Sequence, residues 1–336
     1  MRTVEPTESV RSPRWVTTCP DVTVVIATHN RAAYLPELVD ALERQRHAPP
    51  FEVVIADDGS TDETWTVLTT LARSTELPFL ALRLPPSGGP SVPRNTAVAA
   101  CHGDLIAFTD DDCLPHREWL ARLLPAVHAG RVVQGRTKPM RDGQVSPWDR
   151  TISITAETGL WESCNLAVPR RVFQKAGGFP VLDLLGEGGR GFGEDTVLGS
   201  NAARIAGGFW APTAIVRHRW VRGDYRSHLE AMRRHEAMPE LVRLVPELRD
   251  YCYHRWFRSR RAAAFDVALL AVASAAAVRR VEPLVAAAPW MVLITRAART
   301  RWGRNLAVRI AQEATADAAG LGAQVKGSLQ ARTLLL

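Results

Sequence analysis

The feature that most constrains the fold is a repeated alternation of short apolar runs with amphipathic segments. The run VTVVIAT (22–28) is followed by RAAYLPELVDALERQ (31–45), where apolar residues recur at helical spacing. The same order returns in FEVVIA before TDETWTVLTTLARS, in FLALRL before PSVPRNTAVAAC, and in DLIAFT before HREWLARLLPAVHAG. Strands that alternate with helices predict an α/β fold, with a mainly parallel central sheet flanked by helices on both faces.

Polar residues follow three of these runs, at the points where the strands should end. They are THNR (28–31), DDGS (57–60) and DDD (110–112). The carboxyl ends of parallel strands meet at one edge of a sheet, where ligands bind. Adjacent like charges are unfavourable unless a cation or a proton compensates them, and carboxylate oxygens suit Mg²⁺ or Mn²⁺. The sequence therefore predicts an acidic crevice that holds a divalent cation.

A simpler interpretation of these aspartates is local. Asp110 to Asp112 could open a turn and cap the helix expected near His116, since Asp is a favoured capping residue. The second acidic strand end, DDGS, makes this alternative less favourable. Within DDGS and the residues after it, Asp58 and Ser60 are expected to organise the turn, and STDE (60–63) is typical of a capping box.

Composition sets the broad class of the chain. A chain of 336 residues that is 46% hydrophobic can bury a sizeable core, which predicts one large domain with an appendage. The formal charge is +7, and Arg becomes denser after about Arg217. This basic part either faces an anionic partner, such as a membrane surface or phosphates, or is solvated.

Cysteine usage and the first residues bear on the compartment. The five cysteines are scattered and never in CxxC spacing, so neither a disulfide framework nor a zinc knuckle is indicated, and a reducing cytoplasm fits best. The segment MRTVEPTESVRSPRW (1–15) has no apolar core. It therefore predicts no signal peptide, and residues 1–20 are expected to form a flexible arm.

The C-terminal third has a different composition. AAAFDVALLAVASAAAV (262–278) and PLVAAAPWMVLIT (283–295) are apolar and are separated by Arg279 and Arg280. The first run is interrupted by Asp266 and the second by Pro289, whereas a membrane span usually needs about 20 strongly apolar residues. Two interpretations remain open. The runs form a helical hairpin in the cytoplasmic membrane interface, or a soluble helical subdomain that packs on the core or on a second subunit.

A final helix is expected in NLAVRIAQEATADAAGLGAQVKGSLQARTLLL (305–336). Its inward side chains are predicted to be Val308, Ile310 and Ala311.

Five segments, in order, resemble a known family, the inverting family 2 glycosyltransferases with the GT-A fold. They are VTVVIATHNRAAYL, FEVVIADDGSTDET, GGPSVPRNTAVAACHGDLIAFTDDDCLP, ESCNLAVPRRVFQKAGGF and FGEDTVLGSNAARIAGG, spanning about Val22 to Trp220. The resemblance implies transfer of a sugar from a nucleotide-diphosphate sugar, most often a UDP-sugar, to an acceptor hydroxyl. It implies a catalytic domain over 21–222, with a nucleotide-sugar half to about 115 and an acceptor half after it. A helical region follows over 223–336.

The same resemblance implies roles for particular residues. The donor site is expected to comprise Thr28, Asp57, Gly89, Arg94, Asn95, Asp110 and Asp111, with Thr28 and Asp57 on the base. The metal ligands are expected to be Asp110, Asp112 and His218. The acceptor side is expected to contain Asn165 and Trp161.

The acidic pair of FGED implies the catalytic base. Asp195 is expected to take the proton of the acceptor hydroxyl, and Glu194 to orient the acceptor or its loop. Both residues begin a helix, whose N-terminus favours an ionised carboxylate, so Asp195 is expected to be ionised at neutral pH. The alternative for Asp195 is a capping role alone.

Other residues in the resemblance have structural alternatives. Arg94 could be a surface helix residue, Asn95 could make only local hydrogen bonds, and Trp161 could pack in the core. His218 could be a solvated histidine between two arginines. Pro90 and Pro93 depart from the small residues common in the family, which leaves the choice of donor open.

Three other classes compete with this interpretation. ADDGST is similar to the phosphatase motif DxDGT, but Ala56 occupies the attacking position. A sugar-phosphate nucleotidyltransferase would be expected to open with a glycine-rich loop, and ATHNRAAYL contains no glycine. A catalytically silent nucleotide-sugar binding or scaffold protein is disfavoured by the intact acidic residues. No nucleic-acid partner is predicted, and a homo-oligomer remains open.

Overall fold

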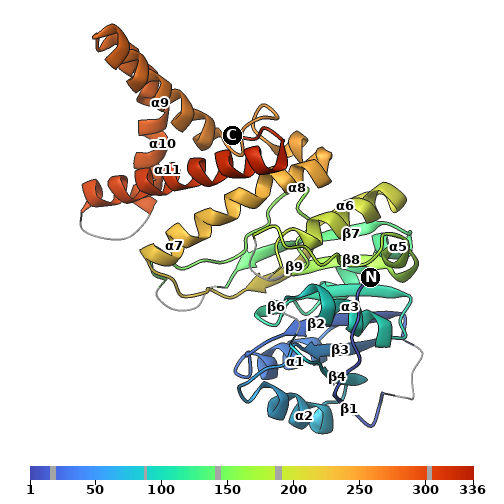
Figure 1. Ribbon diagram of the computed structural model, residues 1–336. Coiled ribbons are helices and arrows are strands. Elements are labelled where there is room, and N and C mark those ends of the chain that lie inside the picture. Colours follow the sequence, from blue (N-terminus) through green and yellow to red (C-terminus); the bar gives the residue numbers. More distant parts are fainter. Residues whose placement is uncertain (16–19, 87–88, 141–144, 186–190, 301–304) are drawn as a thin grey trace. The chain divides into compact units, whose positions relative to one another are not determined.

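The computed structural model describes residues 1–15, 20–86, 89–140, 145–185, 191–300 and 305–336 (Figure 1). The chain forms two compact units. The first comprises Met1–Arg141 and Thr151–Arg219, and the second comprises Asp142–Arg150 and Trp220–Leu336. The boundary expected from the sequence lies after residue 222 and keeps residues 142–150 with the catalytic domain, whereas here that segment groups with the C-terminal helices.

The first unit is built on one sheet. The strands that the structure describes are β1 (Glu8–Arg11), β2 (Val22–Thr28), β3 (Phe51–Asp57), β4 (Phe79–Arg83), β5 (Leu105–Thr109), β6 (Cys113–Pro115), β7 (Val132–Pro139), β8 (Asn165–Pro169) and β9 (Gly208–His218). Their order across the sheet is β1-β4-β3-β2-β5-β8-β7-β9-β6. Strands β4, β3, β2 and β5 pair in parallel, β8 is antiparallel to both β5 and β7, and β7 and β9 are again parallel.

Helices cover both faces of this sheet. The helices α1 (Leu35–Glu43), α2 (Thr64–Ser74) and α4 (Trp119–His128) supply side chains to one apolar cluster. The helices α3 (Ser91–Ala100), α5 (Arg170–Lys175) and α6 (Glu194–Ala206) supply side chains to the other. Alternate residues of one strand enter different clusters, as Val24 and Val25 of β2 do. This two-sided burial explains the almost continuous apolar runs and confirms the predicted fold class.

The N-terminal segment differs from the prediction of a flexible arm. Strand β1 pairs antiparallel with β4, with Glu8 opposite Arg83 and Arg11 opposite Leu80. Trp15 is buried in the second apolar cluster. Backbone pairing at the sheet edge therefore fixes a segment whose composition alone is typical of a loop.

The predicted capping box is also wrong. Helix α2 begins at Thr64, after Glu63, and no side chain caps it. Ser60 instead donates to Asp57 and accepts from the backbone N–H of Asn30, so it braces two strand ends. Likewise, α4 follows Glu118 and is separated by β6 from the aspartates at 110–112. These aspartates therefore do not cap α4.

The second unit is helical. It contains α7 (Tyr225–Met232), η1 (Arg233–Ala237), α8 (Met238–Leu244), η2 (Pro246–Tyr251), α9 (Arg260–Val278), η3 (Glu282–Ala287), α10 (Ala288–Thr300) and α11 (Leu306–Ala331). The prediction that Val308, Ile310 and Ala311 face inward is wrong. Val308 is 50% exposed, and the buried face of α11 instead runs through Glu313, Ala316, Gly320, Gln324 and Gly327. A Cβ on Gly327 would lie 2.0 Å from the Glu236 carbonyl oxygen. The absence of a side chain at Gly327 therefore allows η1 to pack closely against this face of α11.

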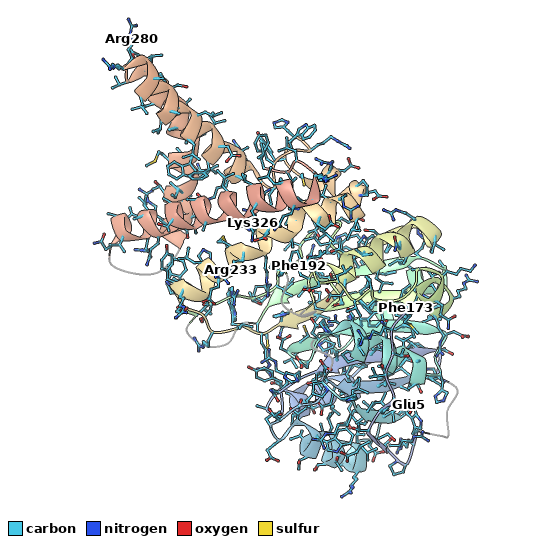
Figure 2. All side chains as sticks on the ribbon, viewed as in Figure 1. Glu5, Phe173, Phe192, Arg233, Arg280 and Lys326 are labelled. Atoms are coloured by element: carbon cyan, nitrogen blue, oxygen red, sulfur yellow. The ribbon has the colours of Figure 1, made fainter. Side chains whose placement is uncertain are left out.

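We call α9, η3 and α10 the apolar hairpin. Among the described helices, α9 is long and apolar enough to cross a membrane by length and composition, and only 22% of that stretch is buried. Leu270 is 68% exposed, and Val281 and Val285 are 76% and 77% exposed. Arg280 lies at the end of α9 that projects from this unit (Figure 2). The hairpin therefore presents apolar side chains to its surroundings.

Candidate active site

A pocket of about 740 Å³ opens at the carboxyl ends of the parallel strands. The first unit alone supplies its walls, from the ends of β2 and β3, the start of α3, the acidic segment after β5 and the end of β9. The lining residues are Ala27, Thr28, His29, Arg31, Asp58, Pro86, Gly89, Pro90, Pro93, Arg94, Asp110, Asp111, Asp112 and His218. The crevice expected at these strand ends is therefore formed.

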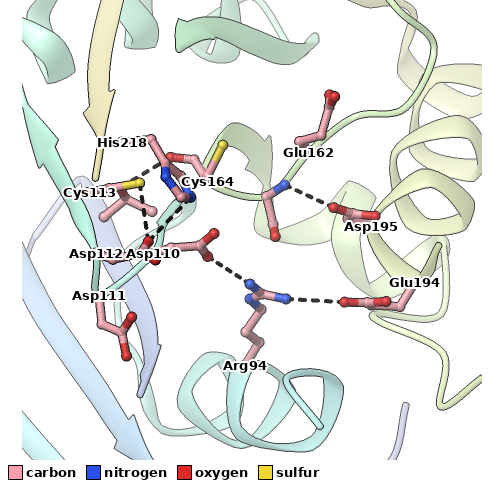
Figure 3. A network of polar contacts seen from close by, with 12 residues as sticks. Arg94, Asp110, Asp111, Asp112, Cys113, Glu162, Cys164, Glu194, Asp195 and His218 are labelled. Atoms are coloured by element: carbon pink, nitrogen blue, oxygen red, sulfur yellow. Dashed lines mark hydrogen bonds and ion pairs between the residues drawn. The ribbon is translucent and has the colours of Figure 1, made fainter. Parts of the chain in front are cut away.

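One wall of the pocket carries a group of potential metal ligands. The donor atoms of Asp110, Asp112, Cys113 and His218 all lie within 4.8 Å of one another (Figure 3). His218 Nε2 is 3.4 Å from Asp112 Oδ1, and His218 is 5% exposed, so it is not a solvated histidine. The pairing of Cys113 with His218 across β6 and β9 brings this distant histidine to the aspartates. Carboxylate and imidazole donors fit a divalent cation such as Mn²⁺.

The electrostatics of the aspartates also fit a cation. Burial, together with the charge of Asp112, raises the pKa of Asp111 to about 7, although Arg31 lies 3.6 Å away. Burial likewise raises the pKa of Asp112, and the charge of Asp110 adds to this effect. A bound cation would favour the ionised forms, because an opposite charge lowers the pKa of a carboxyl group.

Arg94 links the aspartates to the acidic pair of α6. Its guanidinium lies 2.7 Å from Asp110 and 3.5 Å from Glu194 (Figure 3). It also stacks over the Phe179 ring, 5.3 Å from the ring centroid. The residue is 6% exposed and borders the pocket, so it is not a surface helix residue. The buried guanidinium of Arg94 thus pairs with carboxylates from two separate segments of the chain.

The acidic pair begins α6, as expected. The helix follows Gly193, whose φ of +83° suits glycine, and no side chain caps it. Asp195 accepts from the backbone N–H groups of Thr196 at 2.8 Å and Ser163 at 3.3 Å. Asp195 is therefore more than a helix cap, since Ser163 belongs to the loop before β8.

The protonation state of Asp195 differs from the expectation. Burial raises its pKa to about 8, and the charges of Glu194 and Glu162 add to this effect, while Arg94 opposes it. Burial therefore opposes the ionisation at neutral pH that the helix N-terminus was expected to favour. Desolvation of a buried carboxylate outweighs the partial charges of a helix end.

The strand ends contribute pocket residues that were not expected in the donor site. Thr28 lines the pocket, but Asp57 does not, and the next residue, Asp58, does. Asp57 is fully buried, accepts from Ser60, and its Oδ2 has no hydrogen-bond partner among the described residues. His29 and Arg31 also line the pocket. Neighbouring residues at a strand end point to opposite sides, a two-residue period that could have indicated Asp58.

Two asparagines assigned by the resemblance are buried and hydrogen-bonded within the fold. Asn95 bonds both the N–H and the C=O of Phe179. Asn165 accepts from the Trp119 indole and donates to the carbonyls of Arg136 and Ala214. Neither lines the pocket. The hydrogen bonds of the two asparagines support a structural role. Gly89, which the resemblance also assigned to the donor site, does lie in the pocket wall.

Comparison with known proteins agrees with this geometry. Residues 23–181 match the model of the family described as Glycosyl transferase family 2. This region is a family 2 glycosyltransferase domain. The chain is 39% identical over 104 residues to the pre-mycofactocin glycosyltransferase of Mycobacterium tuberculosis, a match that covers 31% of this chain and 20% of that protein. The matched part thus spans about a fifth of that relative. The family resemblance seen in the motifs is confirmed.

Solved structures share the fold. The mannosyltransferase PcManGT from Pyrobaculum calidifontis, in complex with GDP-Man and Mn²⁺, is 19% identical with a TM-score of 0.56, covering 94% of this chain and 88% of that one. S. aureus TarS 1–349, in complex with UDP-GlcNAc, is 18% identical with a TM-score of 0.50, covering 93% and 92%. At these identities the similarity establishes the fold alone.

Proposed function

We propose that this protein is a metal-dependent, inverting glycosyltransferase that moves a sugar from a nucleotide-diphosphate sugar to an acceptor hydroxyl. The observation that carries the proposal is the joining of two acidic groups within one domain. Asp110, Asp112 and His218 form a ligand group on the wall of a large pocket, and Arg94 connects this group to Glu194 beside Asp195. A donor bound at the first group would direct its sugar toward the second.

The ligand group defines the donor end of the reaction. Asp110, Asp112 and His218 would hold a divalent cation, for which Mn²⁺ or Mg²⁺ suits the donors. Such a cation, when bound, stabilises the negative charge that develops on a leaving diphosphate. Arg94, Gly89 and Asp111 would border the diphosphate and ribose, since they line the same pocket.

The carboxylate of Asp195 defines the acceptor end. In a direct displacement the acceptor oxygen bonds to the anomeric carbon while the bond from that carbon to the diphosphate breaks. The proton of the acceptor hydroxyl moves to a carboxylate oxygen of Asp195. A pKa near 8 suits this base, because a base close to the working pH both accepts and releases protons readily. Glu194, held by Arg94, would orient the acceptor or its loop.

Substitution of the metal group tests this function. We expect Asp112→Ala to lower transfer at least about 10²-fold and to weaken Mn²⁺ binding, because a charge-stabilising group at the leaving oxygen is removed. The matched control is Asp40→Ala, whose carboxylate is 47% exposed and pairs with Arg44 on the surface of α1. Transfer by Asp112→Ala at the wild-type rate would refute the metal assignment. Absence of any turnover in the wild type with Mn²⁺ would favour a silent binding or scaffold protein.

The nucleotide is proposed to be UDP. Asp57 does not line the pocket itself, but it adjoins the pocket residue Asp58 at the end of β3, and its Oδ2 has no hydrogen-bond partner among the described residues. We infer that this oxygen accepts a hydrogen bond from the ring N–H of uracil when the donor binds. Cytosine has no such N–H. Titration of UDP, dTDP, GDP and CDP with Mn²⁺ by calorimetry should give the tightest binding for UDP. Tightest binding of CDP would overturn this assignment. Tightest binding of GDP would be compatible with a hydrogen bond from the nucleobase to Asp57 but would change the donor nucleotide.

We also propose that the apolar hairpin contacts the cytoplasmic face of a membrane with anionic lipids. Its exposed aliphatic side chains are accompanied by the exposed Arg279 and Arg280, so both apolar burial and charge favour such a surface.

Sedimentation with vesicles tests the membrane proposal. The full chain should sediment with phosphatidylglycerol vesicles, and Leu270→Glu or Val285→Glu should reduce this. Leu329→Glu, at a side chain on α11 that is 76% exposed but outside the hairpin, is the control. Failure of the wild type to sediment, together with self-association in analytical ultracentrifugation, would instead assign the hairpin to a second copy of the chain.

A further inference from the structure

The loop before β8, Thr158–Ser163, which we call the Trp161 loop, has an unusual backbone. Trp161 has a φ of +55°, in the left-handed region that bulky residues avoid. Such a conformation persists only where the surrounding contacts impose it. The contacts of Trp161 therefore indicate what the loop is held against.

Two glycines make room for the Trp161 side chain. A Cβ built on Gly199 of α6 would lie 2.2 Å from both Cβ and Cγ of Trp161. A Cβ built on Gly208 of β9 would lie 2.5 Å from Cη2 at the far end of the indole. Because the position of Cβ is fixed by the backbone, a rotamer change of Trp161 cannot relieve the clash of its Cβ at Gly199. The indole thus fits against α6 and β9 only because both positions lack a side chain.

Hydrogen bonds from α6 continue this attachment on both sides of Trp161. The Thr196 hydroxyl donates to the Leu160 carbonyl at 2.7 Å, and the Ser163 N–H donates to Asp195 Oδ2 at 3.3 Å. Thr196 and Asp195 lie in the first turn of α6, and Gly199 lies one turn further along. The loop is therefore fastened along one side of α6, and its last residue contacts the carboxylate proposed as the base.

We propose that Trp161 is a positioning residue: by packing against Gly199 and Gly208, it fixes the Ser163 N–H on Asp195 and so orients the general base. The inference rests on the base role proposed above for Asp195. It develops the packing alternative for Trp161 rather than a direct contact with the acceptor, since the indole occupies the space beside the two glycines.

The pH dependence of transfer provides a signature of this role. The charged groups that act on Asp195 are Glu194 of the same helix, Arg94 of α3 and Glu162 of the Trp161 loop. An N–H that donates to the ionised carboxylate favours the ionised form, so loss of the Ser163 hydrogen bond should move the base to a higher pKa. A merely structural role of Trp161 would leave this profile unchanged.

Gly199→Ala is the test variant. We expect donor affinity, measured by calorimetry with Mn²⁺ and UDP, to stay within about twofold, because the donor pocket does not include this loop. We expect kcat to fall about 10- to 100-fold, the scale of a small misplacement of a reacting group, and the midpoint of the kcat–pH profile to move upward. Gly322→Ala is the matched control, since it is also a helical glycine and a Cβ there meets nothing within 4 Å.

A double-mutant cycle shows whether Gly199 acts through Trp161. Trp161→Gly accepts the positive φ and removes the clash, so it should lower kcat by itself, while Gly199→Ala added to it should have little further effect. Equal, independent effects of the two substitutions would overturn the proposal, as would a wild-type kcat–pH profile in Gly199→Ala.

Two further variants keep the result interpretable. If Gly199→Ala does not fold, Trp161→Phe is the alternative variant. It retains the contact at Gly199 but lacks the outer ring of the indole, which reaches Gly208. It should then lower kcat without weakening donor binding, and an unchanged kcat would refute the inference. Asp195→Asn separates the two proposals. If it transfers sugar at the wild-type rate, the base assignment itself is wrong, whatever Gly199→Ala does.

Discussion

In the part of the chain that the structure describes, Arg94 is the one cationic side chain that joins the two acidic groups of the site. Replacement of Arg94 by methionine removes this charge. The guanidinium is 8% exposed as a side chain and contacts Asp110 at 2.7 Å and Glu194 at 3.5 Å. Methionine keeps most of the volume above Phe179 but carries no charge. The Glu194 carboxylate, whose Oε2 already has no hydrogen-bond partner among the described residues, would then be buried without a counterion.

The expected loss of stability follows from this burial. Removing one partner of a buried ion pair typically costs about 3–5 kcal/mol, because the remaining charge stays desolvated. For a domain of 150–250 residues, about 1 kcal/mol corresponds to about 2–4 °C in Tm, so Tm should fall by about 6–20 °C. An exposed pair gives far less. Arg44→Met is the control in the same unit, since Arg44 is 74% exposed and its pair with Asp40 is worth about 0–1 kcal/mol.

Chemical denaturation at pH 7 gives the decisive measurement, with Arg94→Met compared with the wild type and with Arg44→Met. Arg94 also lowers the pKa of Asp195, so the variant should need a higher pH for transfer. A loss of stability below about 1 kcal/mol, the size expected for an exposed pair, would refute the idea that Arg94 joins desolvated carboxylates.

The remaining predictions concern the proposed base Asp195, the buried side-chain amide of Asn165 and the pocket residue Arg31. Transfer by the wild type should rise as the pH increases through about 8, because Asp195 must lose its proton to act as a base, and a rate–pH profile of Asp195→Asn should lack this rise. Asn165→Ala should lower the free energy of unfolding by at least about 1–3 kcal/mol in chemical denaturation, since it leaves the buried Trp119 indole N–H without its acceptor. Gly135→Ala should act in the same direction, because its Cβ would lie 2.3 Å from the Asn165 amide oxygen. Arg31→Met should weaken donor binding by about 10- to 100-fold in calorimetry without changing Tm, since Arg31 lines the pocket and is 39% exposed.

The order of strands and helices in the first half could be predicted because it depends on local patterns. The run at 22–28 forms β2 with the expected bounds, and Leu35, Leu38, Val39 and Leu42 are the buried residues of α1. An apolar strand must be covered on both faces, and helical periodicity states which side of each helix does so. The acidic strand ends were predictable for the same reason, since parallel strands bring their carboxyl ends to one edge.

Pairing between distant segments was not predictable from local patterns. The N-terminal segment has the composition of a loop, yet β1 adds to the sheet edge, because backbone hydrogen bonds require only an accessible strand and no particular side chains. In α11, Val308 near the start is 50% exposed, and the buried face further along includes the small residues Ala316, Gly320 and Gly327. Small residues are required where another element packs closely against the helix. The sequence of one helix does not show which element will pack there.

The sequence by itself determined the α/β architecture, the family of residues 23–181 and the acidic residues of the site. The tertiary structure decided their relations. It placed His218 beside Asp112 through the pairing of β6 with β9, buried Arg94 between Asp110 and Glu194, and set Trp161 against two glycines. It also raised the pKa of Asp195, against the expected effect of the helix N-terminus, because the pKa of a carboxyl group depends on how far surrounding atoms exclude water. That exclusion is a property of packing in three dimensions, and no pattern of neighbouring residues along the chain encodes it.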